Sequence, residues 1–382
     1  MAAQMGPIRA LEIHHVNVEH GDATIIAVRD ETTRPIYQYK LLIDASTTKG
    51  QNMLAEYFAS NFEDTEFDHV IASHYHDDHI RGFADGLGVT FHSRSITDVG
   101  GYDLTAVQSI LSPSDAGVAV PSVNPATYPA NPPNIPVSEV FNDYQKAIKF
   151  SARDAEPQKL QRLPLPLPSP VGHPITLFNL GVNITLTCIA GNGYVFGGAQ
   201  RDVGGGQDPN PNNYGLAFIL QYGAFRYYTG GDLGGSGAPY VNHEASLAGV
   251  IGHVCAFKSN HHGSDNSNNA AFLAAMTPAV CVTSVGRAAR YRLPGGNFLN
   301  RLNATNTVHG QQGFFFTNLA DYGPDNARRT QAQGLFGQRA NTCFRPGSAT
   351  YVIRVPFHAN IVAQSIFQVY EDGAPIATFN CH

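Results

Sequence analysis

The sequence is poor in charge and has neither a basic run nor a long apolar run. Charged residues make up only 14% of the 382 residues, and the formal net charge is -6. Because no Lys/Arg-rich run occurs, the chain lacks the electrostatic footprint of a stable nucleic-acid binder, which weighs against a long nucleic acid as substrate. No run approaches the roughly 18 apolar residues that a membrane helix needs, so we predict no membrane span.

The cysteines show no spacing typical of a metal or redox motif. No CxxC pair occurs, and the odd number leaves at least one cysteine unpaired in any disulfide scheme. We interpret all five as buried small hydrophobic side chains; they are Cys188, Cys255, Cys281, Cys343 and Cys381. The compartment stays open, because the chain would suit the cytoplasm or export with its signal removed. The oligomeric state stays open as well.

What the chain does contain is apolar material for a large core, since 43% of its residues are hydrophobic. In the N-terminal third, β-rich runs alternate with turn residues. We predict strands at Ala10–Val18, Ala23–Val28 and Tyr39–Ile43, a helix at Lys49–Asn61 and a strand at Asp68–Ser73. The order of strand, helix and strand predicts an α/β layered fold.

From about residue 100 to 210 the chain becomes rich in proline and asparagine. So long an irregular stretch inside a compact domain is usually a functional insertion or lid. Within it we predict a helix near Val137–Phe150 and strands at Ile175–Phe178 and Val182–Ile189. Its aromatic residues would either line a cleft or pack in the core; they are Tyr102, Tyr128, Phe141 and Tyr144.

The second half repeats the alternation of strands and helices. We predict strands at Leu216–Tyr222, Phe225–Thr229, Val254–Ser259 and Ala279–Ser284, with helices near Ala245–Ile251 and Asn269–Met276. After residue 302 comes a terminal β-rich unit with a turn at Asp372-Gly373.

One short segment concentrates metal-ligand side chains at the end of a predicted strand. His74, His76, Asp78 and His79 lie within six residues, and imidazole and carboxylate are ligands that suit zinc and similar ions. His74 and His76, two apart on extended chain, can face one metal. Asp78 and His79, where the chain turns, can face a second ion beside it.

This segment matches the HxHxDH signature of the metallo-β-lactamase superfamily at every defined position. Six further segments resemble its ComEC-like hydrolase branch, which also includes phosphorylcholine esterases. They are Val16–Ala23, Leu42–Ser46, Asn212–Leu216, Tyr228–Leu233, Lys258–Ser267 and the closing segment Ser284–Leu302. The resemblance implies a four-layer αββα sandwich over residues 1–302, with a lid-like insertion at about 100–210. Residues 303–382 would be a C-terminal β-rich extension packed on the same domain.

The resemblance also implies a ligand set. His74 and His76 would hold the first metal, Asp78 and His79 the second, while Asp232 bridges the two. His262 would complete the second metal, with His261 facing substrate; the exchange of these two roles is the alternative. The ions would be two divalent metals, with zinc preferred and manganese the alternative.

One departure from the superfamily concerns the first metal. Most members supply a third histidine shortly upstream of the bridging aspartate, but residues 209–213 contain none. Asn212, Asn213 or water would fill this position. His173 superficially resembles the missing ligand, although it lies far upstream and enters a predicted strand.

Two cations about 3.5–4 Å apart can lower the pKa of a bridging water from about 15.7 toward about 7, which makes hydroxide available as the nucleophile. Asp78 and His261 are the candidate catalytic residues, since His261 could contact substrate or protonate a leaving group. We expect Asp44 to orient a metal-bound histidine. We expect Asp77 to be either solvated or in contact with a metal ligand, and not to take part in catalysis. Lys258 is interpreted as a solvated charge at a strand end. Ser264 and Ser267 either contact phosphate or cap the next helix.

The branch resemblance favours hydrolysis of a phosphoester, most of all a phosphodiester, on a small or surface-presented molecule. A lactone, ester or amide is the alternative substrate for the same hydroxide. A third hypothesis is a non-catalytic metal-binding module. The absence of the third histidine favours the phosphoester, because three-histidine first-metal sites are usual in the lactonase and lactamase branches.

Overall fold

The computed structural model describes most of the chain outside the insertion. The described residues are 8–98, 139–151, 161–162, 174–191, 193–196, 210–237, 239–286, 292–305, 312–319, 327–358 and 365–381. The predicted insertion therefore falls largely outside this part of the chain, and so do Tyr102, Tyr128 and His173.

The first sheet joins the N-terminal strands to the last strands of the chain. Its order is β20-β19-β18-β1-β2-β3-β5-β7-β8, antiparallel from β20 to β3 and parallel from β3 to β8. The strands are β1 (Arg9–His15), β2 (Thr24–Asp30), β3 (Tyr37–Ile43), β5 (His69–Ile71), β7 (Ser95–Thr97), β8 (Gln161–Arg162), β18 (Tyr351–Pro356), β19 (Ile366–Glu371) and β20 (Ala374–Asn380). A separate pair consists of β4 (Glu66–Phe67) and β6 (His92–Ser93).

The second sheet begins antiparallel and ends parallel. Its order is β11-β10-β12-β13-β14-β15-β16-β17, with β9 paired to β10, and the parallel part runs from β13 to β17. The strands are β9 (Pro174–Asn179), β10 (Asn183–Gly191), β11 (Tyr194–Val195), β12 (Ala217–Tyr222), β13 (Phe225–Thr229), β14 (Ala256–Lys258), β15 (Val280–Thr283), β16 (Gln312–Phe316) and β17 (Thr342–Arg345).

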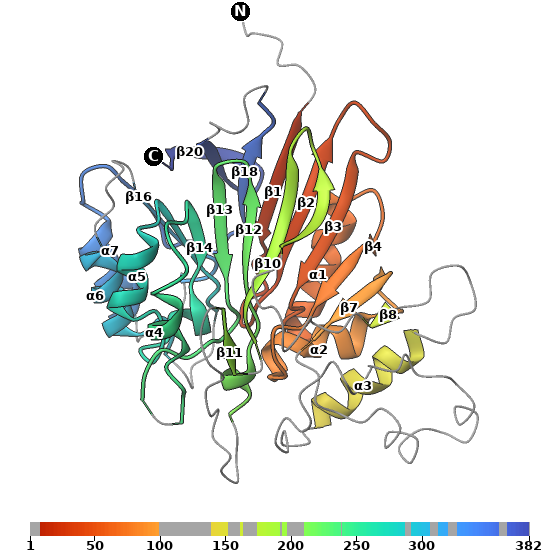
Figure 1. Ribbon diagram of the computed structural model, residues 1–382, viewed down its shortest axis with the longest axis horizontal. Helices are drawn as coiled ribbons and strands as arrows, with labels where there is room; N and C mark the ends of the chain where they lie inside the picture. Colours follow the sequence, from red (N-terminus) through yellow and green to blue (C-terminus); the bar gives the residue numbers. More distant parts are fainter. Residues whose placement is uncertain are drawn as a thin grey trace, which may run out of the picture.

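Helices cover the outer faces of the two sheets (Figure 1). They are α1 (Thr48–Asn61), α2 (Asp77–Gly86), α3 (Glu139–Ser151), α4 (His243–Leu247), α5 (Ala270–Met276), α6 (Gly296–Ala304) and α7 (Ala327–Phe336), with short 3₁₀ turns η3 (Pro211–Tyr214) and η4 (Asn260–Gly263). In Figure 1, α4 to α7 lie beside the second sheet, and α1 to α3 lie beside the first. The predicted α/β class and αββα sandwich are confirmed.

Burial on both faces explains the apolar runs of the central strands. In β2 six of the seven residues are buried, as expected for a strand that packs against a second sheet on one face and helices on the other. One core cluster fills the space between the sheets and under α1 to α3, and a second lies between the second sheet and α4 to α7. Phe141 and Tyr144 of α3 belong to the first cluster, which settles their two interpretations in favour of core packing.

The elements that the sequence predicted lie within a few residues of these bounds, but the sequence predicted neither α6 nor α7. The helix predicted near Ala245–Ile251 is shorter and begins earlier, at His243, where Asn242 caps it by accepting a hydrogen bond from Ala245 N. Asp372-Gly373 is the two-residue turn between β19 and β20, and both residues have positive φ, as a type I′ turn requires. The described residues contain no helix long and apolar enough to cross a membrane.

Two of the five cysteines interpreted as buried small hydrophobic side chains are buried but joined to each other. Cys255, just before β14, forms a disulfide with Cys381, just after β20. The spacing hid this pair because the chain returns from the second sheet to the first before it reaches Cys381. Among the described residues Cys188, Cys281 and Cys343 are free, and the last two are buried as expected. The division of the chain at residue 302 stays a prediction.

Candidate metal centre

The motif segment follows β5 and is held in place by Asp44 at the end of β3. The Asp44 carboxylate accepts hydrogen bonds from Ser73 N and Ser73 Oγ, both at 2.7 Å. Its Oδ2 also lies 2.7 Å from His79 Nδ1. An Nδ1–H that donates to Asp44 leaves the lone pair of His79 Nε2 directed toward the centre. Asp44 thus makes the contact expected of a residue that orients a ligand.

His74, His76 and Asp232 form one group of ligand atoms. They lie within 4.8 Å of one another, and His74 Nε2 faces His76 Nδ1 at 3.0 Å. Because Ser73 Oγ already donates to Asp44, it accepts the proton of His74 Nδ1 at 3.1 Å, which leaves His74 Nε2 as an acceptor. His74 Nε2 is also 3.8 Å from Asp232 Oδ2.

Asp232 also belongs to a second group, together with Asp22, His79 and His262. Asp232 Oδ1 lies 3.3 Å from His79 Nε2 and 3.5 Å from His262 Nε2. Asp78 adds a carboxylate at the edge of this group, with Oδ2 at 3.2 Å from His262 Nε2. The two groups therefore share Asp232, the position that the sequence resemblance assigns to a bridging ligand.

Asp232 reaches both groups because of a tight turn after β13. Gly231 has a φ of 52°, and a Cβ there would lie 2.5 Å from Ser73 Oγ. A side chain at this position would push the turn away from the motif segment. The turn and the ends of β3, β5 and β14 meet at one edge of the sandwich, where open α/β folds place their ligands.

The two adjacent histidines of η4 have different environments. Both adopt positive φ, 50° each, a conformation that is uncommon for residues other than glycine. His262 is buried, and its Nδ1 donates to Ser284 O at 2.9 Å, which directs Nε2 toward the carboxylates of Asp78 and Asp232. His261 is less buried and lies 5.5 Å from the ring of Tyr240. The deeper position of His262 suits a ligand, and the more exposed position of His261 suits a residue that faces substrate.

Glu244 of α4 fixes the loop that carries these histidines. It is fully buried and accepts hydrogen bonds from Asn260 Nδ2 at 2.8 Å, Asn268 N at 2.6 Å and Asn269 N at 2.7 Å. The loop is also closed on itself, since Asn268 Nδ2 donates to Asn260 O. A buried carboxylate with satisfied oxygens can hold the positive-φ backbone of η4 in one conformation.

Lys258 is not the solvated charge that we expected. Its side chain is 2% exposed, and Nζ forms a 2.5 Å ion pair with Asp22 Oδ2. Burial disfavours the charge of Lys258, but Asp22 and Asp232 raise its pKa above the ordinary value. Neither Asp22 nor Lys258 had an assigned role, although both lie in segments that resemble the ComEC-like branch. The ion pair joins those segments across the two sheets.

The carboxylates and imidazoles of the centre shift one another's pKa values. Burial would raise the pKa of Asp232, but the imidazoles of His262, His79 and His261 lower it well below its usual range. Burial would also lower the pKa of His262, but Asp232, Asp22 and Asp78 raise it to about 9. The protein without metal thus keeps protons on His79 and His262, the pKa of each being raised, and a cation would bind in competition with them.

Several buried atoms of the centre lack hydrogen-bond partners among the described residues. They are His79 Nε2, His262 Nε2, Asp232 Oδ1, Asp22 Oδ1 and both amide atoms of Asn212. Buried polar atoms are normally satisfied, so a convergent set without partners fits the binding of cations. Imidazole and carboxylate donors suit divalent first-row ions. The residues present therefore fit a pair of metal ions.

Asn212 and Asn213 have different surroundings. The amide of Asn213 donates to Pro239 O at 3.0 Å and accepts from Val241 N at 2.8 Å, so this side chain braces the loop after Asp232. Asn212 lies against the cavity with its amide unsatisfied. Of the two, only Asn212 has amide atoms left for a metal or substrate.

A cavity of about 590 Å³ opens beside the centre. Its lining includes centre residues and polar neighbours; these are His20, His76, Asp77, Asp78, Asn210, Asn212, Asp232, Tyr240, His261, His262, Ser264, Asn266 and Leu293. Ser264 is on the wall, whereas Ser267 donates to Asn260 O and braces the loop. His20, with Nε2 at 3.3 Å from Asp78 Oδ2, had no assigned role, because nothing in its spacing connects it to the motif.

A model of the metallo-beta-lactamase superfamily matches residues 38–99. The matched part contains Asp44 and the whole segment from His74 to His79, and the match supports this superfamily. It does not extend to Asp232 or His262. No curated protein matches the sequence.

Several solved structures match parts of the chain. A metallo-beta-lactamase with an HARLDQ motif from Cronobacter sakazakii is 13% identical over 64% of this chain and 73% of its own, with a TM-score of 0.32. Zn(2+)-bound PqqB from Methylobacterium extorquens is 12% identical over 88% and 99%, with a TM-score of 0.37. CmlA, a diiron beta-hydroxylase from Streptomyces venezuelae, is 10% identical over 73% and 45%, with a TM-score of 0.33. Likenesses this weak carry no information about activity.

Replacement of Lys258 by methionine should destabilise the metal-free protein. The change leaves Asp22 buried and unpaired, which costs about 3–5 kcal/mol in the free energy of unfolding. Urea denaturation in the presence of a chelator measures this loss. The double variant Asp22→Asn/Lys258→Met should recover most of it, because no unpaired charge remains. A single variant as stable as the wild type would contradict a structural role for the pair.

Replacement of Glu244 by glutamine should change how stability depends on pH. Burial raises the pKa of Glu244 from its ordinary 4.5 to about 6. The folded protein therefore holds this proton at higher pH than the unfolded chain, and stability falls by about 2 kcal/mol as pH rises through that window. Urea denaturation of metal-free wild type and Glu244→Gln on either side of the window measures the difference. Equal pH slopes in both proteins would refute the assignment.

Proposed function

We propose that this protein is a binuclear metal-dependent hydrolase of phosphodiesters that resembles the ComEC-like branch. One observation carries the proposal: two groups of ligand atoms share Asp232 on the wall of a cavity of about 590 Å³. The superfamily consists mostly of metal-dependent hydrolases, and two adjacent cations suit the in-line displacement of a phosphoester.

In this proposal His74, His76 and Asp232 hold one ion, and Asp78, His79, Asp232 and His262 hold the other. When bound, two divalent cations supply Lewis acidity and a hydroxide at neutral pH. Asp44 and Ser284 fix the rings of His79 and His262 through their Nδ1 atoms. Asp22 remains paired with Lys258, so the negative charge of this carboxylate is neutralised beside the centre.

The cavity favours a substrate with a single negative charge. Among the described residues that line it there is no lysine or arginine, while Asp77, Asp78 and Asp232 contribute carboxylates. With Asp78 and Asp232 bound to the two cations, the described lining offers no further cation for the second charge of a phosphomonoester, whereas a phosphodiester carries only one charge. Uncharged donors for phosphate oxygens come from the amide of Asn212 and the hydroxyls of Tyr240 and Ser264.

His261 is the proposed catalytic group outside the metal pair. Its Nε2 is 3.7 Å from Asp232 Oδ2, and it lines the cavity beside Tyr240. From there it can donate a hydrogen bond to a substrate oxygen or protonate the leaving group. Asp77, whose side chain is 57% exposed and paired with Arg81, stays outside this machinery.

Metal analysis tests the binuclear centre. The oxidised wild type, reconstituted with zinc or manganese and freed of excess metal, should hold about two ions per chain. Asp232→Asn removes a ligand from both groups and should lose at least one ion. Asp77→Asn removes an acid from the start of the same helix as Asp78 and should keep both. One ion or fewer in the wild type would rule out a metal pair.

An assay against four substrates tests the reaction. The reconstituted wild type should hydrolyse an activated phosphodiester faster than the matching monoester, a lactone or a β-lactam. His261→Ala should keep both ions and lose about a hundredfold in kcat, since it removes a donor used in the transition state. Turnover of the lactone alone would support the lactone hydrolase instead. No turnover with two ions bound would support a metal-binding module.

A further inference from the structure

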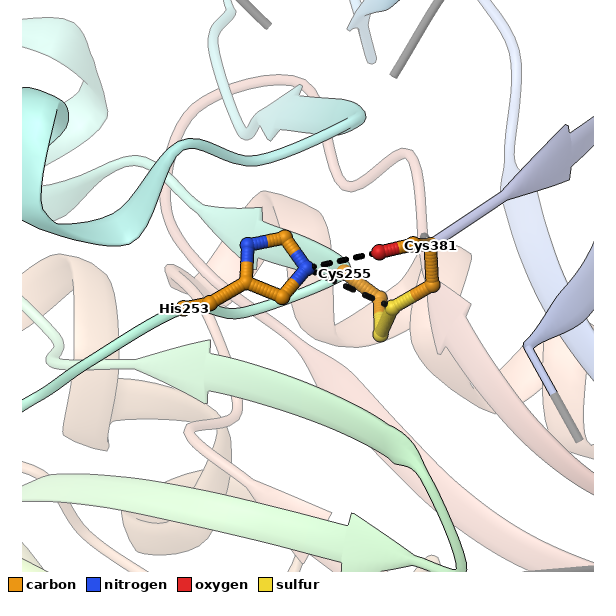
Figure 2. A group of neighbouring side chains, drawn as sticks. All are labelled: His253, Cys255 and Cys381. Atoms are coloured by element: carbon orange, nitrogen blue, oxygen red, sulfur yellow. Dashed lines mark hydrogen bonds between the residues drawn. A yellow bond between two sulfur atoms is a disulfide. The ribbon is translucent and has the colours of Figure 1, made fainter. Parts of the chain in front are cut away.

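A second cluster of metal-ligand side chains lies away from the cavity. Figure 2 shows His253, Cys255 and Cys381, with the imidazole pointing toward the two sulfur atoms. One ligand atom from each residue lies within 4.8 Å of the others. Both cysteines are fully buried, while His253 is half-buried at the edge of the cluster.

The spacing of these atoms is close to that of a tetrahedral metal site. Bonds of about 2.3 Å to sulfur and about 2.0 Å to nitrogen place neighbouring nitrogen and sulfur ligands about 3.5 Å apart. His253 Nε2 lies 3.7 Å from Cys381 Sγ. The Cα atoms of the cysteines are 4.9 Å apart, which lets the sulfurs separate by side-chain rotation once their bond is broken.

The surroundings of His253 suit both a disulfide state and a metal-bound state. In the disulfide state Nε2–H donates to Cys381 O at 2.9 Å, and Nδ1 accepts from Thr277 Oγ1 at 2.9 Å. In the other tautomer Nδ1–H donates to Met276 O at 3.1 Å, and Nε2 presents its lone pair to the sulfurs. A hydrogen bond from Nδ1 to a backbone carbonyl is the usual support of a histidine ligand.

We infer that His253, Cys255 and Cys381 form a thiolate-containing metal site that opens when the Cys255–Cys381 disulfide is reduced. A dithiol reductant donates two electrons and two protons, which gives two cysteine thiols and leaves the reductant as its own disulfide. A divalent ion then replaces the two thiol protons and binds both sulfurs and His253 Nε2. A water molecule takes the fourth position. Two thiolates and one imidazole select zinc or another thiophilic ion.

This site is separate from the centre at the cavity. Cys255 precedes β14, and the loop with His261 and His262 follows the other end of the same strand. The donor sets also differ, because the centre offers nitrogen and oxygen ligands only. A spectroscopic signal from sulfur ligands therefore distinguishes this site from the centre at the cavity.

Cobalt substitution tests the inference. The full-length protein is reduced, freed of reductant without oxygen and titrated with Co²⁺. The reduced wild type should gain a near-ultraviolet thiolate-to-cobalt charge-transfer band equivalent to one ion per chain, and the disulfide form should not. Cys381→Ser should abolish the band, and Cys188→Ser, the matched control at a free cysteine, should keep it. His253→Gln should weaken cobalt binding at this site at least about tenfold.

Two further measurements keep the inference falsifiable. Asp232→Asn should retain the band, so a failure of the proposed hydrolase and a failure of this site give different results. Zinc should also protect Cys255 and Cys381 of the reduced wild type from alkylation, as read by peptide mass spectrometry, even where a cysteine variant folds poorly. Absence of the band and of zinc protection in the reduced wild type would overturn the inference.

Discussion

The structure depends on a concentration of buried negative charge between the two sheets. Asp22, Asp44 and Asp232 are buried there with Asp78 half-buried beside them, and among these four described residues Asp22 alone is paired with a buried lysine. Carboxylates cost several kcal/mol to bury unless a positive charge or several donors stabilise them. Histidines can compensate only while they hold protons, and a bound cation can replace those protons. The hydrogen bonds of Asp44, Ser284 and Glu244 hold the ligand side chains in place around this charge.

The part of the centre that the sequence predicted is the part set by local spacing. His74 to His79 lie on one strand end and the following helix turn, so their proximity needs no knowledge of the fold. Asp232 and His262 were found through resemblance to known motifs, and the structure places both beside the motif segment. Because the ends of parallel strands meet at one edge, the α/β pattern carried enough information to expect this convergence.

The sequence missed contacts that only the packing of the two sheets creates. Lys258 follows an apolar strand and looks like a solvated end, but its strand lies inside the sandwich and its side chain reaches Asp22 from the other sheet. Cys255 and Cys381 meet for a similar reason, since the terminal strands return to the first sheet. Residue types gave no signal in either case, because both pairs depend on nonlocal topology. Glu244 was missed because its partners are backbone and asparagine amides, which carry no motif.

The strand β14 relates the two metal-ligand clusters physically. Its three residues are buried, and hydrogen bonds to β13 and β15 fix it on both sides. A rigid strand of this kind transmits little of a local change at Cys255 to the loop at His262, because that loop is held separately by Glu244 and Ser284. The two clusters also prefer different ions, since sulfur donors favour thiophilic metals and carboxylates favour harder ones. Occupancy of one cluster therefore need not follow occupancy of the other.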